Sequence, residues 1–435
     1  MARIETLTAP RVGKLAEETG HRTGGAPDWA LIAAVMTLTL VGLIFVFSSS
    51  FAVGEQLFGD PRFFAKRQLL GAGIGAVAFV FFALLDYRRL RAWSPLIMAG
   101  AVLLLLAVIT PGVGHSQNGA QRWIQFGSAP PIQPSEIAKL AIVIYIAAWL
   151  SSRGDAIRHV TLGVLPFSVI VGFIGFLIMA EPDLGTAVTI TLIAGGLFFI
   201  AGAALKHIVV LILGGGTVLF GIIGLFGYGL DRFTQFVSAE SDPEAGGFQI
   251  LQLLIALGSG GLTGVGIGES RQKFFYVPSA HTDGVFAIIG EEVGFIGAIL
   301  IIFLFAFLIH RGIRIASKAP DQFGTLLAMG VVIWFATQAF FNIGGVTRTI
   351  PLTGIPLPLI SFGSSALVAT LAAGGVLVSV SRYSIEREEY REQEPRRRLR
   401  DYVVRPFSQD ARSTAGEPEM QAESTIQASG QEGAV

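Results

Sequence analysis

The sequence predicts an all-α polytopic membrane protein with ten transmembrane helices and a large extracellular loop between helices 7 and 8. Of its 435 residues, 52% are hydrophobic and only 14% are charged, whereas a soluble globular protein is usually about 25% charged. The apolar stretches also approach the ~20 residues that a helix needs to cross a bilayer, and they contain few charges. Cysteine is absent, which excludes disulfides and thiolate metal sites.

Ten apolar stretches are the expected membrane spans, and each is about 16 to 27 residues long. They run over 29–50, 69–86, 93–110, 136–151, 161–180, 184–204, 207–228, 284–310, 322–345 and 361–381. No short apolar core with a small-residue cleavage site opens the chain, so we expect 29–50 to be retained as the first span. The stretch 248–267 is apolar but rich in Gly and Ser. It is either an eleventh span or, as we expect, a re-entrant or interfacial helix in a long loop.

The distribution of basic residues sets the expected orientation. With ten spans and an internal N-terminus, 22 of the 31 Lys and Arg residues fall in inner segments, eight fall in outer loops, and Lys139 lies within a span. Cytoplasmic loops carry the excess of Lys and Arg, so both termini are expected to be cytoplasmic. The chain then divides into a cytoplasmic N-terminal segment (1–28), a ten-helix membrane domain (29–382, outer loop 229–283) and a cytoplasmic, largely disordered tail (383–435).

Charged residues gather near the outer ends of the spans. The acids are Glu136, Glu181, Asp183, Asp283, Glu291 and Glu292. The bases are Lys66, Arg67, Arg122, Lys139, Arg271, Lys273 and Arg348. Ionisable side chains are costly at membrane depth and usually mark function. Their placement suggests an anionic substrate presented from the lipid, for which a diphosphate on a polyprenyl carrier is suitable. The alternative is that these charges simply pair with one another at the interface.

Asp283 ends the long loop, in the AHTD motif at 280–283, directly before a span. A carboxylate there acts either as general base on a sugar hydroxyl or as the cap of the following helix, and position alone favours the cap. Glu292 lies nine residues further on, about 14 Å along a helix and too far for a shared proton. Glu291 and Glu292 are therefore expected to be buried partners of Lys139 or of an arginine.

A second group of candidates flanks one short loop, where Arg122 precedes a helix start with Ser135 near its cap. Glu136 and Lys139 stand at i and i+3 on one helix face and can pair. The residues leave open whether this pair is structural or binds substrate. No metal site is predicted, because Glu181 and Asp183 are only two acids and the histidines lack zinc spacing.

Five segments follow one another along the chain in the order of a known family. They are GAQRWI at 119–124, QPSEIAKLA at 133–141, EPDLGTA at 181–187, AHTDGVFAIIGEEVGFIGA at 280–298 and NIGGVTRTIPLTGIPLPLISFGSSA at 342–366. Together they resemble the SEDS family (shape, elongation, division and sporulation), whose best-known members are FtsW and RodA. The chain departs from the family at Gly284, which is usually bulky there, and at FGSS (362–365), which is usually YGGS.

The resemblance implies ten transmembrane helices, with a large outer loop after the seventh, and peptidoglycan glycosyltransferase activity that polymerises lipid II into glycan strands. The essential aspartate of the family falls on Asp283, so we now prefer catalysis to capping for this residue. Substrate-binding residues are then expected to be Arg122, Trp123, Glu136, Lys139, Lys66, Arg67, Lys273, His281, Thr282, Glu292 and Ser361.

The expected reaction is an inverting glycosyl transfer from a polyprenyl diphosphate donor, the nascent glycan, to the 4-hydroxyl of lipid II. A divalent cation (Mg or Mn) is the one candidate cofactor, and the sequence contains no dedicated site for it. The resemblance implies a class B penicillin-binding transpeptidase and other divisome membrane proteins as partners. Nucleic acid is not expected, because the net charge is zero.

Within the family, the division branch fits best, because AIIGEE at 287–292 and YIAAWL at 145–150 resemble FtsW. We therefore expect a multi-pass protein of the bacterial cytoplasmic (inner) membrane that acts at the division septum. The alternatives are an elongation polymerase of the RodA type, a lipid II flippase and an inactive scaffold. A flippase would carry charges midway through the bundle, whereas the motifs here gather at one face.

Overall fold

The structure of the chain, a computed structural model, describes residues 25–117, 120–125, 127, 130–226, 236 and 247–383. Ten long helices make up most of this part. They are α2 (Trp29–Phe58), α3 (Phe63–Leu84), α4 (Tyr87–Ile109), α5 (Pro134–Ser151), α6 (Leu165–Ala180), α7 (Leu184–Ile200), α8 (Leu205–Phe226), α11 (Val285–Ser317), α12 (Gln322–Val346) and α13 (Ser364–Arg382). Most of the predicted N-terminal segment, nearly all of 227–246 and the tail from 384 lie outside the described residues.

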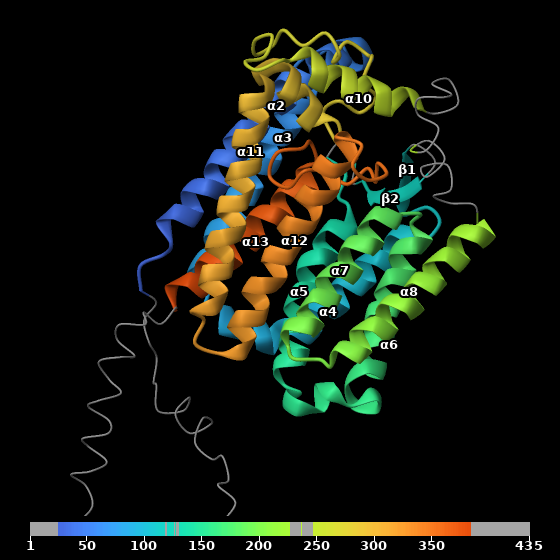
Figure 1. Cartoon of the computed structure of the whole chain (residues 1–435), viewed down its shortest axis with the longest axis vertical. Helices are drawn as coiled ribbons and strands as arrows, with labels where there is room; N and C mark the ends of the chain where they lie inside the picture. Colours follow the sequence, from blue (N-terminus) through green and yellow to red (C-terminus); the bar gives the residue numbers. More distant parts are fainter. Residues whose placement is uncertain are drawn as a thin grey trace, which may run out of the picture. The chain divides into compact units, whose positions relative to one another are not determined.

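Each predicted span coincides with one of these helices (Figure 1). Within the described part, eight helices are long and apolar enough to cross a membrane, while α7 and the stretch Leu205–Thr217 of α8 are apolar but shorter. Large apolar side chains such as Val77 and Leu96 point outward and are 71% and 75% exposed. Such exposure suits a surface that is covered by lipid. The chain is therefore a helical polytopic membrane protein, and ten as the number of crossings stays a prediction.

Two small features modify the all-α prediction. The strands β1 (Gly114–Gln117) and β2 (Ala120–Ile124) form an antiparallel pair between α4 and α5. The short helix α10 (Phe248–Ser259) packs against the start of α11. Its 12 residues are too few to cross a bilayer, because a helix rises about 1.5 Å per residue. This favours a loop helix over an eleventh span for the stretch 248–267.

The predicted ends of the first two spans, at residues 50 and 69, are wrong, since most of the stretch 51–68 between them is helical. α2 continues almost through it and ends at Gly59, whose φ of 64° is the left-handed conformation that glycine adopts without strain. The Gly59 N–H closes the helix by donating to the Glu55 carbonyl at 2.9 Å. α3 begins only a few residues later, so Lys66 and Arg67 stand on its first turns and not in a loop.

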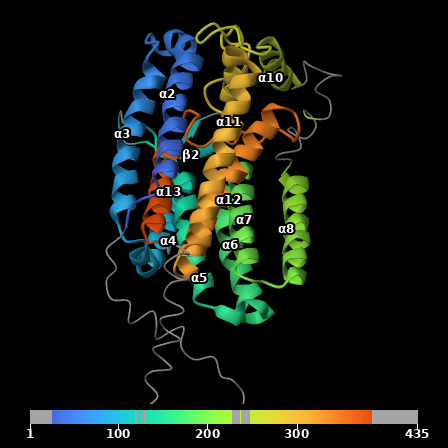
Figure 2. The same cartoon turned by 60° about the vertical axis from the view of Figure 1, so that its left-hand side comes forward.

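Small residues bring α3 and α13 into close contact (Figure 2). A Cβ atom at Gly75 would lie 2.5 Å from the Leu371 side chain, and one at Gly71 would lie 2.9 Å from the Ser364 main chain. Glycines spaced four apart let membrane helices approach this closely. The contact holds the start of α13, and with it the preceding loop, beside α3.

α11 is interrupted at Gly294, where φ is 76° and ψ is −171°. The segment 261–266 supplies the missing partners through four main-chain hydrogen bonds of 2.9 to 3.1 Å to residues on both sides of the break. Unpaired main-chain groups are costly at membrane depth, so the break requires this segment. The loop before α11 is thereby fastened to the first turns of the helix that it precedes.

The first and last described residues lie at the same end of the bundle. The Gly25 N–H donates to the Arg382 carbonyl at 2.8 Å, and the Asp28 N–H donates to the Ser381 hydroxyl at 3.1 Å. An ion pair between Arg311 and Asp28 also holds this end together. An even number of crossings requires both ends to lie on one side, which agrees with ten.

Candidate functional site

The AHTD motif forms the end of the loop before α11. The Thr282 hydroxyl lies 3.0 Å from Asp283 Oδ1 and 3.0 Å from the Ser279 carbonyl oxygen. The N-cap residue of α11 is Gly284, which makes no side-chain cap hydrogen bond. Asp283 therefore precedes the capping position, so the cap that the sequence first favoured is wrong. Its side chain is half-buried and remains accessible.

His281 fastens the motif to α3 and to the loop before α13. Its ring centroid lies 4.4 Å from that of Phe64 and 5.4 Å from that of Phe362. Its carbonyl accepts a hydrogen bond from the Phe362 N–H at 2.9 Å. Burial lowers the pKa of His281 to about 4, because desolvation disfavours the charged imidazolium. The ring is therefore neutral at neutral pH and supplies no positive charge to an anion.

Arg122 fixes the β-hairpin to the turn between α6 and α7. Its Nε donates to the Glu181 carbonyl at 3.1 Å, and its Nη2 donates to the Pro182 carbonyl. Asp183 caps α7 by accepting a hydrogen bond from a main-chain N–H at 3.1 Å. Trp123 is half-buried in the same hairpin. The GAQRWI and EPDLGTA motifs, far apart in the sequence, therefore meet in one place.

Glu136 and Lys139 form the predicted pair on the first turns of α5. Lys139 Nζ lies 2.6 Å from Glu136 Oε1, and the two side chains are 1% and 3% exposed, respectively. The second oxygen, Glu136 Oε2, and the neighbouring Ser135 hydroxyl are buried without a hydrogen-bond partner among the described residues. Buried polar atoms normally have partners, so these two atoms mark a place where a ligand or water would complete the bonding.

Glu181 has a buried carboxyl group, although the sequence alone showed it only as one of two acids in a turn. It is 0% exposed, and neither carboxyl oxygen has a hydrogen-bond partner among the described residues. Desolvation, reinforced by the negative charge of Asp183 and opposed by Arg122, raises the pKa of Glu181 to about 8. The carboxyl group is therefore mostly protonated at neutral pH. In the described part of the chain, no three His, Cys, Asp or Glu side chains are grouped to hold a metal ion.

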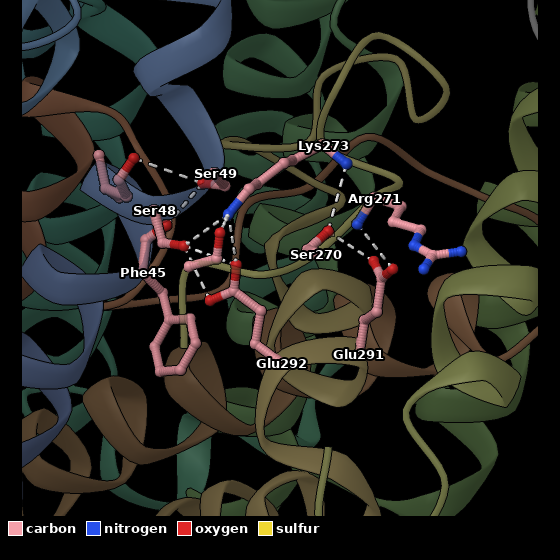
Figure 3. Close-up of polar contacts among 10 residues, drawn as sticks. Phe45, Ser48, Ser49, Ser270, Arg271, Lys273, Glu291 and Glu292 are labelled. Carbon is pink, nitrogen blue, oxygen red and sulfur yellow. Dashed lines mark hydrogen bonds and ion pairs between the residues drawn. The ribbon is translucent and has the colours of Figure 1, made fainter. Parts of the chain in front are cut away.

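Lys273 and Glu292 form a second buried ion pair, between α2, α11 and the loop before α11 (Figure 3). Lys273 Nζ lies 2.9 Å from Glu292 Oε1, and both side chains are 0% exposed. The Ser48 hydroxyl lies 2.6 and 2.8 Å from the two Glu292 oxygens. Lys273 also donates to the Gly268 carbonyl. These contacts account for both charges within the protein.

The expected partners of Glu291 and Glu292 are corrected by this arrangement. Glu292 pairs with Lys273 and not with Lys139, while Glu291 accepts hydrogen bonds from the Ser270 hydroxyl and from the main-chain N–H of Arg271 (Figure 3). The reason is the fold of the loop before α11, which returns to the first turns of that helix. The guanidinium group of Arg271 takes no part in these bonds.

The other candidates lie on α3 and in the loop before α13. Lys66 is exposed and pairs with Asp60 at 2.7 Å. The Arg67 guanidinium carbon lies 4.2 Å from the Phe63 ring centroid. Arg67 stands one turn after Phe64, whose ring contacts His281. The Ser361 hydroxyl accepts a hydrogen bond from a main-chain N–H four residues earlier at 2.8 Å, so it closes a turn.

Residue 355 connects the AHTD motif to the EPDLGTA turn. The Ile355 carbonyl accepts a hydrogen bond from Asn342 at 2.9 Å, and the same amide donates to the Asp283 carbonyl at 3.0 Å. On its other side, a Cβ atom at Gly185 would lie 2.9 Å from the Ile355 side chain. Sequence analysis missed Asn342, although it opens the NIGGV motif.

The family model described as "Cell cycle protein", which takes its name from FtsW, RodA and SpoVE, matches residues 28–386. The chain belongs to this family. Stage V sporulation protein E of Bacillus subtilis (strain 168) is 45% identical over 359 residues, which are 82% of this chain and 98% of that protein. The "Probable peptidoglycan glycosyltransferase FtsW" of Trichlorobacter lovleyi is 38% identical over 81% of this chain and 93% of that protein.

Solved structures of the family share the fold. A chain from the structure described as "Structural coordination of polymerization and crosslinking by a peptidoglycan synthase complex" has a TM-score of 0.68 and 27% identity, covering 82% of this chain and 98% of that one. The rod shape determining protein RodA of Thermus thermophilus has a TM-score of 0.60 and 26% identity, covering 83% and 98%. The SEDS resemblance seen in the motifs is thus confirmed.

Proposed function

We propose that this chain is a peptidoglycan glycosyltransferase that polymerises lipid II at the outer face of the bacterial cytoplasmic membrane. The proposal draws on a relative named as a probable peptidoglycan glycosyltransferase and on the arrangement of the AHTD motif. The carrying observation is Asp283 itself. Its side chain is half-buried, and the residue lies directly before the N-cap of α11. Hydrogen bonds to the carbonyl groups of residues 281 and 283 hold the main chain around it in place.

In the proposed reaction, Asp283 takes the proton from the 4-hydroxyl of the terminal N-acetylglucosamine of lipid II. The resulting oxygen attacks the anomeric carbon of the growing strand, and the bond to the polyprenyl diphosphate breaks with inversion. General base catalysis of this kind contributes typically about 10²–10⁴-fold. The neutral ring of His281 and the Thr282 hydroxyl would orient Asp283 rather than exchange protons with the substrate.

The leaving diphosphate needs positive charge. Lys139 and Lys273 are buried and already paired with Glu136 and Glu292, so they are poor candidates for this role. We assign it to Arg67, because it lies on the α3 turn next to the Phe64 ring that contacts His281. Among the described residues, no three His, Cys, Asp or Glu side chains are grouped to hold a divalent cation.

The finer biological role is proposed to be septal wall synthesis. FtsW-named relatives support it, while the 45% identity to a sporulation protein makes a role in sporulation the second candidate. A class B penicillin-binding transpeptidase is the proposed partner, consistent with a structural neighbour that comes from a peptidoglycan synthase complex. Wall labelling and localisation of a fluorescent fusion during growth and sporulation would distinguish the septal from the spore role.

The enzymatic proposal is tested against the flippase alternative in liposomes. The purified chain, with its transpeptidase partner, is supplied with fluorescent lipid II on the outer leaflet only. We expect glycan polymers that a muramidase digests. Transfer of lipid II between leaflets without polymer formation would instead support a transporter and contradict the proposal.

A further inference from the structure

We propose that Asn342 is a positioning residue for Asp283. Its amide group ties the main chain of the AHTD motif to the loop between α12 and α13, so that the carboxylate of Asp283 is presented in one fixed place. The inference rests on the proposed catalytic role of Asp283 and adds a residue from a different helix to that site.

The Asn342 side chain bonds two carbonyl groups at once. It is 1% exposed, and its Nδ2 lies 3.0 Å from the Asp283 carbonyl oxygen and 2.9 Å from the Ile355 carbonyl oxygen. An asparagine amide carries two N–H donors, so each carbonyl receives one. Because carbonyl oxygens only accept, these partners also settle which side-chain atom is nitrogen.

The main chain of the AHTD motif is thereby held on both sides of Thr282. His281 is fixed by the N–H of Phe362, and Asp283 is fixed by Asn342. Phe362 belongs to the loop between α12 and α13, and Asn342 is bonded to that loop through the Ile355 carbonyl. This segment has no regular helix or strand of its own, so side-chain bonds determine where its carbonyl groups lie.

A second buried amide holds the far end of the same loop. Gln68 of α3 is 1% exposed. Its Nε2 donates to the Ser361 carbonyl at 3.1 Å, and its Oε1 accepts from the Gly363 N–H at 3.1 Å. Of the two amides, Asn342 alone bonds the AHTD motif directly among the described contacts. Asn342 is therefore the residue whose loss should displace Asp283 most.

The chemistry of the position explains which substitutions are informative. Asn342→Ala leaves a buried carbonyl group at Ile355 and a part-buried one at Asp283 without these donors. Asn342→Asp keeps the size, and burial against two carbonyl oxygens favours its neutral acid, which donates one hydrogen bond and not two. A misplacement of about 1 Å at a reacting group can cost about 10²-fold in rate, whereas substrate contacts elsewhere stay intact.

The experiment measures lipid II polymerisation by the full chain, with its transpeptidase partner, for Asn342→Ala, Asn342→Asp and Asp283→Asn. The matched control is Ser379→Ala. Ser379 is 1% exposed and bridges two main-chain groups, but it stands about 22 Å along α13 from the start of that helix.

We expect Asn342→Ala to lower kcat at least about tenfold while KM for lipid II changes less than about threefold. Asn342→Asp should retain more kcat than Asn342→Ala, and Ser379→Ala should keep wild-type kcat despite a similar fall in melting temperature. The Asp variant preserves the size of the side chain and so covers the case in which the Ala variant does not fold.

Wild-type kcat in Asn342→Ala, or a fall that merely follows the folded fraction, would overturn the inference. So would an equal loss in Ser379→Ala. The proposed function fails separately: if Asp283→Asn is active, the base is wrong, whereas an inactive Asp283→Asn beside a fully active Asn342→Ala contradicts only the positioning role.

Discussion

At the scale of single residues, protonation of Glu181 makes the stability of the folded protein depend on pH. Its pKa is raised from 4.5 to about 8 in the folded chain. Between these two values the folded protein binds more protons than the unfolded protein does, so stability must fall as pH rises through this window. Stability from this group is fully present only below the unfolded pKa. The cause is desolvation of a carboxyl group that has no hydrogen-bond partner among the described residues.

We predict that Glu181→Gln flattens the pH dependence of stability. Melting temperatures of wild type and variant would be compared at about pH 5 and about pH 9. The wild-type value should fall more over this interval than that of the variant. The slope is the test, because the new amide changes the absolute stability as well. Parallel curves for the two proteins would show that Glu181 does not titrate in this way.

Residue pairing was predictable only where the partners are neighbours in sequence. Glu136 and Lys139 are three residues apart, and helix geometry alone placed them together. Lys273 and Glu292 are 19 residues apart, and Asn342 and Asp283 are 59 apart. Such contacts depend on how loops fold back onto helices, for which the sequence offers no periodic signal.

At the scale of elements, the broken helix α11 and the segment 261–266 form one unit. The segment bonds the main chain on both sides of Gly294, and the buried pair of Lys273 and Glu292 fastens the following loop to α2. Sequence analysis assigned both charged residues to substrate binding. Their mutual contacts and complete burial support a structural role instead.

This structural role predicts different results for single and double substitutions. Lys273→Met and Glu292→Leu should each destabilise the protein by about 3–5 kcal/mol, because each leaves one buried charge unpaired. The double variant should recover most of this stability and should still polymerise lipid II. Thermal unfolding and polymerisation assays on all three proteins provide the check. A stable double variant without activity would return these residues to the substrate site.

Two elements were missed or misplaced for identifiable reasons. The β-hairpin could have been predicted, because Asn118-Gly119 lies between its strands and Asn-Gly is a strong hairpin signal. The first span was predicted to end at Ser50, the last of three consecutive serines, whereas α2 runs on to Phe58. Ser48 and Ser49 find partners inside the protein, on Glu292 and on the Phe45 carbonyl, so α2 continues past them.

At the scale of the whole molecule, the helices could be predicted from the sequence because a bilayer requires long apolar stretches. Spanning helices need about 20 apolar residues, and each of the ten predicted spans corresponds to one described helix. The described ends meet at one end of the bundle, as an even number of crossings requires. The helix-to-helix contacts within the bundle could not be predicted, because every span is apolar on most of its surface.

The orientation of the bundle is tested with single cysteines, since the chain has none of its own. We predict that Glu269→Cys reacts with a membrane-impermeant maleimide added to intact cells. Asp155→Cys should react only after the membrane is permeabilised. Both positions are exposed in the structure. The reverse labelling pattern would invert the topology and place the AHTD motif in the cytoplasm.

The most direct test of the account is lipid II polymerisation by Asp283→Asn at matched protein levels. The substitution keeps the size of the side chain and removes its basicity. The N-cap of α11 is Gly284, and Asn caps a helix about as well as Asp, so loss of a cap would not explain a loss of rate. If Asp283 is the general base, the variant should fold, bind its transpeptidase partner and lose at least about a hundredfold in rate. Retention of more than about a tenth of the wild-type rate would contradict a catalytic role for Asp283.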